Sequence, residues 1–112
     1  MTNQTFTPTP TVDAKLIATY RCLEDVRRQA RALAAVLIDE VSFEIAGVYG
    51  PNAMLVVEGF ESKGGLITLG ADGITKDGAI DLKSIRVRLT KREEEIEGKI
   101  VELEAELLAP SE

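Results

Sequence analysis

Lys83, Arg86 and Arg88 form the only basic cluster in the part of the chain that is predicted to form a sheet. If this segment is a strand, Arg86 and Arg88 point to the same face because they are two residues apart. Guanidinium groups can bind phosphate through two parallel hydrogen bonds. The cluster is therefore a candidate site for a phosphate, a nucleotide or another anionic ligand. The alternative is a solvated face paired with acidic neighbours such as Glu44 or Glu58.

The chain lacks histidine and holds a single cysteine, Cys22, among its 112 residues. This composition excludes histidine-activated nucleophiles, histidine metal sites, disulfides within the chain and CxxC redox or zinc sites. The carboxylates of Glu44, Glu58 and Glu61 are candidates for acid-base chemistry, but no motif pairs them with a nucleophile. We expect a protein that is not an enzyme and that needs no cofactor or metal. Cys22 is expected to be a small buried apolar side chain.

The glycine-rich stretch at residues 70–78 does not match a known ligand loop. If Gly73 is aligned with the invariant glycine of an EF-hand, Asp72 is the only one of the four side-chain ligands that is present. The phosphate-binding patterns GxxxxGK[ST] and GxGxxG are absent from the chain. The Asp-Gly pairs at residues 72–73 and 77–78 therefore predict two turns.

A long helix is predicted from about residue 14 to residue 39, with Asp13 as its N-cap. Its apolar residues recur at the three- and four-residue spacing of a helical seam. The seam residues on this helix are Leu16, Leu23, Val26, Leu33 and Leu37. A second apolar row lies beside them, so the helix is expected to pack on both a sheet and another helix.

The apolar period then changes to the alternation that is typical of β-strands. The predicted strands span residues 41–49, 54–61, 66–69 and 79–89. Glycine-containing turns separate them, which favours an antiparallel meander. In the fourth strand Ile85, Val87 and Leu89 share a face, and a shift of phase near Ser84 suggests a β-bulge.

The last predicted element is an amphipathic helix from about residue 91 to residue 108, which Thr90 and Glu93 would begin as a capping box. Its seam residues are Ile96, Ile100, Leu103 and Leu107. The net charge of the whole chain is −6, and residues 91–112 account for most of it, with three basic and eight acidic groups. The acidity is therefore a local property of this helix.

Together these elements predict a single α+β domain at residues 11–110: a long N-terminal helix, a four-stranded antiparallel β-meander and a C-terminal amphipathic helix. Residues 1–10 are predicted to form a flexible arm and residues 111–112 a short tail. The first helix is longer than the last, so part of its seam is expected to remain for a second copy of the chain. The order helix, sheet, helix is similar to that of prefoldin-like chaperones, in which helices flank β-hairpins.

The expected location of the protein is the cytoplasm. The sequence has no apolar stretch of the length that spans a membrane and no signal-peptide pattern at its start. A lone cysteine without a disulfide partner suits a reducing compartment. Because an acidic chain is repelled by phosphates, direct nucleic acid binding is not expected.

The predicted function is that of a non-enzymatic homo-oligomer that binds another protein or a small anionic ligand. The seam residues of the two helices would hold the copies together, and the basic cluster would be the ligand site. The alternative is a small phage-type inhibitor of host defence. Such an inhibitor would block a nucleic-acid-handling protein by acidic mimicry, or would hold a nucleotide signal in an oligomer interface.

Overall fold

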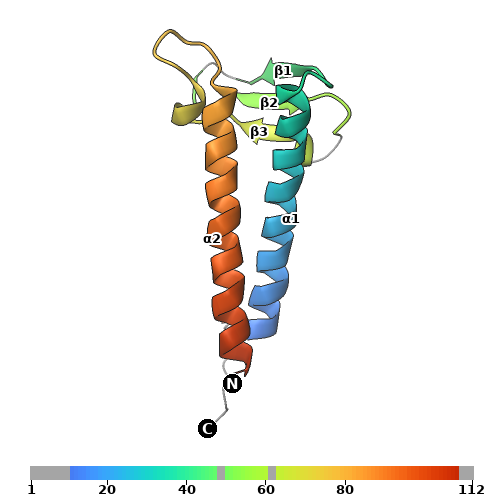
Figure 1. Ribbon diagram of the computed structural model, residues 1–112, viewed down its shortest axis with the longest axis vertical. Coiled ribbons are helices and arrows are strands. Elements are labelled where there is room, and N and C mark those ends of the chain that lie inside the picture. Colours follow the sequence, from blue (N-terminus) through green and yellow to red (C-terminus); the bar gives the residue numbers. More distant parts are fainter. Residues whose placement is uncertain (1–10, 48–49, 61–62, 109–112) are drawn as a thin grey trace, which may run out of the picture.

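A computed structural model describes residues 11–47, 50–60 and 63–108 of the chain. The predicted N-terminal arm and the predicted C-terminal tail lie outside the described residues. The chain folds into two long antiparallel helices with a small sheet at one end of the pair (Figure 1). The α+β class, with an antiparallel sheet between two helices in sequence order, is confirmed.

The described residues form seven elements. In chain order they are α1 (Val12–Leu37), β1 (Phe43–Ala46), β2 (Met54–Val57), the short 3-10 turn η1 (Lys63–Gly65), β3 (Leu66–Thr68), a second 3-10 turn η2 (Ala71–Gly73) and α2 (Leu82–Leu108). The sheet lies where α1 ends and α2 begins, and the opposite end of the helix pair extends away from it (Figure 1). We call that opposite end the distal end.

Helix α1 begins two residues earlier than its predicted start. Thr11, rather than Asp13, is the N-cap, because its side-chain oxygen accepts a hydrogen bond from the backbone N–H of Ala14 at 3.1 Å. Asp13 lies in the first turn, where its negative charge is favourable near the helix N-terminus. The helix ends at Leu37, and Asp39 just beyond it adopts a left-handed backbone with φ of 64°.

The sheet has three antiparallel strands in the order β1-β2-β3. Leu55 of β2 pairs with Ile45 of β1 and with Ile67 of β3, so these side chains share one face. Leu55 and Ile67 are fully buried in the core that the helices complete. The core therefore lies between one face of the sheet and the two helices, and it continues along the contact between α1 and α2 as far as Leu16 and Leu103.

The predicted fourth strand at residues 79–89 is wrong, because α2 begins at Leu82. The structure instead has an isolated antiparallel bridge between Ile74 and Ile80 in this part of the chain. Ile85 has no exposed surface, whereas Val87 is 66% exposed, so the two residues do not share a face. Apolar side chains at Ile85 and Leu89 are four residues apart, which places them on one side of a helix.

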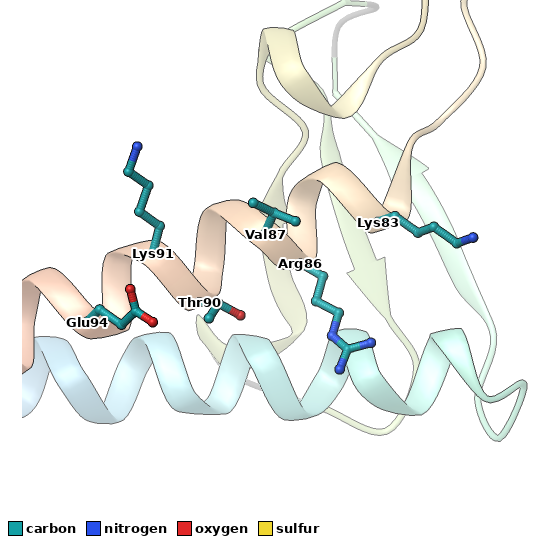
Figure 2. Close-up of a pocket in the computed structure, with 6 residues that line it drawn as sticks. All are labelled: Lys83, Arg86, Val87, Thr90, Lys91 and Glu94. Carbon is teal, nitrogen blue, oxygen red and sulfur yellow. The ribbon is translucent and has the colours of Figure 1, made fainter.

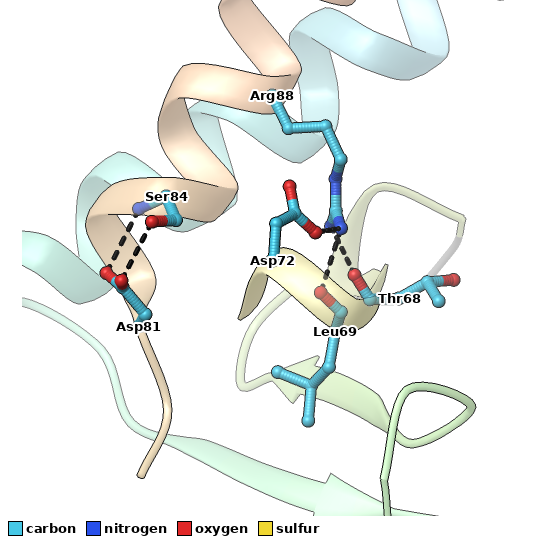
Figure 3. A network of polar contacts seen from close by, with 6 residues as sticks. All are labelled: Thr68, Leu69, Asp72, Asp81, Ser84 and Arg88. Carbon is cyan, nitrogen blue, oxygen red and sulfur yellow. Dashed lines mark hydrogen bonds and ion pairs between the residues drawn. The ribbon is translucent and has the colours of Figure 1, made fainter. Parts of the chain in front are cut away.

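Asp81 caps the N-terminus of α2. Its carboxylate accepts hydrogen bonds from the backbone N–H of Ser84 at 3.1 Å and from the Ser84 hydroxyl at 2.8 Å (Figure 3). The predicted capping box of Thr90 and Glu93 is wrong, since both residues lie inside the helix. The Ser84 hydroxyl, followed by its backbone N–H, lowers the pKa of Asp81 below its usual value of 3.8.

Because of this cap, the contribution of Asp81 to the free energy of unfolding should depend on pH. A lowered pKa in the folded state means that the unfolded chain takes up the proton first as the pH falls. The stabilisation by Asp81 is thus fully present above the unfolded pKa, near 3.8, and is lost as the pH falls through the lower folded pKa. The stability difference between wild type and Asp81→Ala should be constant at neutral pH and shrink in acid, as urea titrations would measure. Asp81→Asn, an uncharged cap, should show no such trend relative to Asp81→Ala.

The two 3-10 turns attach the sheet to the helices by close backbone approach. Gly64 of η1 is buried against α1, and a Cβ atom there would lie 2.7 Å from the Cβ of Arg28. Gly73 of η2 is buried against α2, where a Cβ would lie 3.0 Å from Cγ1 of Ile85. A side chain at either glycine would therefore crowd the helix that its turn contacts.

Candidate interaction surfaces

Arg88 joins α2 to the end of the sheet. Its Nη1 donates to the carbonyl oxygen of Leu69 at 2.8 Å and to Oδ1 of Asp72 at 2.7 Å, while Nη2 donates to the carbonyl oxygen of Thr68 (Figure 3). One guanidinium thus holds the last residue of β3, the residue after it and a residue of η2. Since these three hydrogen bonds are made within the chain, Arg88 has a structural role here.

Arg86 lies on a different side of α2 from Arg88. Residues two apart on a helix point about 200° apart, so the same-face geometry expected of a strand does not apply. Lys83 and Arg86 instead share an exposed groove with Val87 and Lys91 (Figure 2). Within the described residues, none of the three cations forms a salt bridge within 4.0 Å. Glu44 and Glu58, the acidic neighbours considered from the sequence, line a separate hollow on the sheet.

The charges along α2 are strongly segregated. Residues 82–92 contain five basic residues and no acidic one, a net charge of +5. Residues 93–108 contain seven glutamates and one lysine, a net charge of −6. We call these segments the basic half and the acidic half of α2. A helix is stabilised by acidic residues at its N-terminus and basic residues at its C-terminus, so this order is unfavourable for the helix itself.

Two ion pairs and one hydrogen bond connect α1 to the acidic half of α2. Arg27 of α1 lies 3.6 Å from Glu93 and 3.7 Å from Glu97, and the Tyr20 hydroxyl donates to Glu104 at 3.4 Å. The charged groups are all substantially exposed, so each pair contributes only tenths of a kcal/mol. These contacts align the two helices more than they stabilise them.

The predicted seam residues are packed mostly within one chain. Leu16, Leu23, Val26, Leu33, Ile96, Ile100 and Leu103 are buried, Leu37 is half-buried and Leu107 is 48% exposed. The expected surplus of seam on the first helix does not arise, because α2 has 27 residues and α1 has 26. A seam between copies through these residues stays a prediction, and the uncovered apolar surface lies elsewhere.

That uncovered surface is found largely on the helix pair. Toward the distal end α1 exposes Ile17 and Tyr20, and α2 exposes Val101, Leu107 and Leu108. Val87 is exposed on α2 next to Arg86. Contiguous exposed apolar patches mark protein interaction surfaces, which makes the helix pair the candidate for such a surface here. In contrast to the sequence expectation, Cys22 is also exposed.

Other kinds of site have little support in the described part of the chain. Residues 11–47, 50–60 and 63–108 contain no group of three acidic or cysteine side chains placed to hold a metal ion. Among the same residues, neither helix has a stretch with the apolarity and length of a membrane span. Comparison with models of protein families, with curated proteins and with solved structures finds no match. The exposed surfaces of the helix pair therefore provide the main basis for assigning a function.

Proposed function

We propose that this protein is a non-enzymatic, self-associating binding protein that uses the exposed surfaces of its helix pair. The observation that carries the proposal is the set of large apolar side chains left uncovered on α1 and α2. Val87, Val101 and Leu108 have exposed fractions of 66%, 67% and 83%. Burying such side chains contributes about 25 cal/mol per Å² of apolar area. Association with another chain therefore provides stabilisation that the single chain lacks.

The composition of the core supports the same proposal. Among the described residues the buried core consists of apolar side chains, and no polar or charged residue is buried. A catalytic group usually sits in a partly buried pocket with a perturbed pKa. The lowered pKa of Asp81 follows from its helix-capping hydrogen bonds with Ser84 and marks no such pocket. The titratable groups are thus arranged as a solvated surface that suits recognition.

The alternative of an acidic inhibitor keeps one supporting observation, which is the net charge of −6 on the acidic half of α2. The inhibitor hypothesis also included a nucleotide bound by Arg86 and Arg88 together. The positions of the two arginines do not favour this site, because Arg88 is bound to Asp72 and to the sheet. Self-association is therefore the function that we favour.

Size-exclusion chromatography with light scattering tests the proposal. The expected result is a dimer or a larger assembly at micromolar concentration, with a mass that falls on dilution. A single species with the mass of one 12.1 kDa chain across this concentration range would contradict it.

A further inference from the structure

The outer face of α2 has a seven-residue apolar repeat that no other described part of the chain covers. Val87, Glu94, Val101 and Leu108 are successive members of this repeat, and residues seven apart lie on one side of a helix. The buried residues Ile85, Leu89 and Ile96 lie on the opposite side, toward α1. We call this repeat the outer stripe. Three of its four members are apolar and mostly exposed.

The outer stripe begins in the basic half of α2 and ends in the acidic half. Lys83, Arg86 and Lys91 surround Val87, and these cations form no salt bridge with another described residue. Glu102 and Glu104 follow Val101 in the sequence. A partner that fits this surface therefore has an apolar stripe with acidic charge at one end and basic charge at the other.

A second copy of α2 has this pattern when it runs in the opposite direction. We propose that two copies of the chain pack antiparallel along their outer stripes, with the basic half of each α2 on the acidic half of the other. This inference rests on the proposed self-association and names the surface that performs it. A twofold axis near the middle of α2 makes the contact self-complementary.

The direction of pairing follows from the charges. A parallel pair would place +5 against +5 and −6 against −6, and like charges in contact are unfavourable. The antiparallel pair places opposite charges together at both ends. This arrangement also gives a reason for the charge order in α2, which is unfavourable for the helix dipole.

Gly98 is consistent with a close approach near the axis. It lies between Glu94 and Val101, and a Cβ atom at this position would meet no other atom within 4 Å. Glycine inside a helix costs about 1 kcal/mol relative to alanine, and no contact with another described residue requires it here. A neighbouring helix can approach the bare backbone at this point more closely than elsewhere.

Charge reversal tests the inference. The acidic variant carries Lys83→Glu, Arg86→Glu and Lys91→Glu, all at exposed positions. Its control carries Lys15→Glu, Arg21→Glu and Lys76→Glu, which are also exposed and make the same change in net charge away from the outer stripe. Light scattering across a dilution series should show a dimer dissociation constant at least about tenfold higher for the acidic variant than for the control.

A mixing experiment tests whether two variants that dimerise weakly alone form a stable dimer with each other. The basic variant carries Glu94→Lys, Glu102→Lys and Glu104→Lys, and should also dimerise at least about tenfold more weakly than wild type. An equimolar mixture of the acidic and basic variants should form a heterodimer, because opposite charges then meet along the whole stripe. Native mass spectrometry separates the heterodimer from both homodimers by mass.

The outcomes separate this inference from the proposed function. If wild type self-associates and the acidic variant and its control do so equally well, the antiparallel pairing is wrong while self-association stands. The outer edge of β1, which borders no other described strand, would then be the next surface to test. If wild type is a monomer, both proposals fail.

The direction of pairing has its own measurement. With Cys22 replaced by serine, spin labels at residue 87 in one copy and at residue 108 in the other should be closer than two labels at residue 87. Because a helix rises 1.5 Å per residue, labels at the two ends of the stripe are roughly 30 Å apart along one helix. A shorter distance between the two residue-87 labels would overturn the antiparallel arrangement.

Discussion

Ile85→Ala is expected to lower the free energy of unfolding by about 3–5 kcal/mol, whereas Val87→Ala should change it by less than about 0.5 kcal/mol. Ile85 has no exposed surface and contacts Gly73 of η2, so removing its side chain leaves a cavity between α2 and the sheet. Val87 is 66% exposed and lies on the outer stripe. The two substitutions are only two residues apart, which makes each the control for the other.

Urea titrations followed by circular dichroism measure both values. They should be made at a protein concentration at which wild type and Val87→Ala have the same association state, since Val87 belongs to the proposed dimer contact. Equal losses for the two variants would mean that both side chains face the core, as in a strand. That result would contradict the helical structure of residues 82–89.

The segment at residues 82–89 shows why periodicity alone assigned the wrong element. Ile85, Val87 and Leu89 alternate with polar residues and resemble a half-buried strand. Ile85 and Leu89 also fit a helix, and they continue into the row formed by Ile96, Ile100 and Leu103. Asp81, three residues before Ser84, supplies a cap for a helix that begins at Leu82. A short apolar run fits both the two-residue period of a strand and the 3.6-residue period of a helix. Here the longer apolar row along α2 favours the helix.

Longer regular features were predicted more accurately. The structure places α1 within about two residues of its expected ends, and the predicted strands at 54–61 and 66–69 contain β2 and β3. Most of the predicted seam residues are buried, since a sustained seven-residue pattern specifies which side of a helix packs inward. The part of the predicted first strand at residues 48–49 lies outside the described residues.

The candidate site was less predictable, because its geometry depends on the element that carries it. On a strand Arg86 and Arg88 would form a pair, but on α2 one faces an open groove and the other faces the sheet. The partner of Arg88, Asp72, is 16 residues away, and no local spacing rule links them. Extending α2 back to Leu82 also adds Lys83, Arg86 and Arg88 to the helix that carries the seven glutamates. The segregated charge of α2 becomes apparent only once this boundary is known.

Arg88→Met is expected to lower the free energy of unfolding by about 2 kcal/mol, the second-largest effect among the substitutions considered. Hydrogen bonds to charged groups contribute about 1.5–3 kcal/mol. Arg88 makes three such contacts, but the Asp72 carboxylate is 46% exposed and water can replace part of the loss. Methionine keeps most of the aliphatic volume of the arginine side chain, so the variant removes the donors without leaving a large cavity.

Arg92→Met is the matched control for Arg88→Met on the same helix. Arg92 forms an exposed ion pair with Glu95 at 3.7 Å, so its replacement should cost less than about 0.5 kcal/mol. Arg88→Lys should fall between wild type and Arg88→Met, because one ammonium group cannot match the planar fork that reaches Leu69 and Thr68. Urea titrations of the three variants give the order directly. If Arg88→Met costs no more than Arg92→Met, the contacts of Arg88 do not hold the sheet on α2, and its guanidinium is available to a ligand.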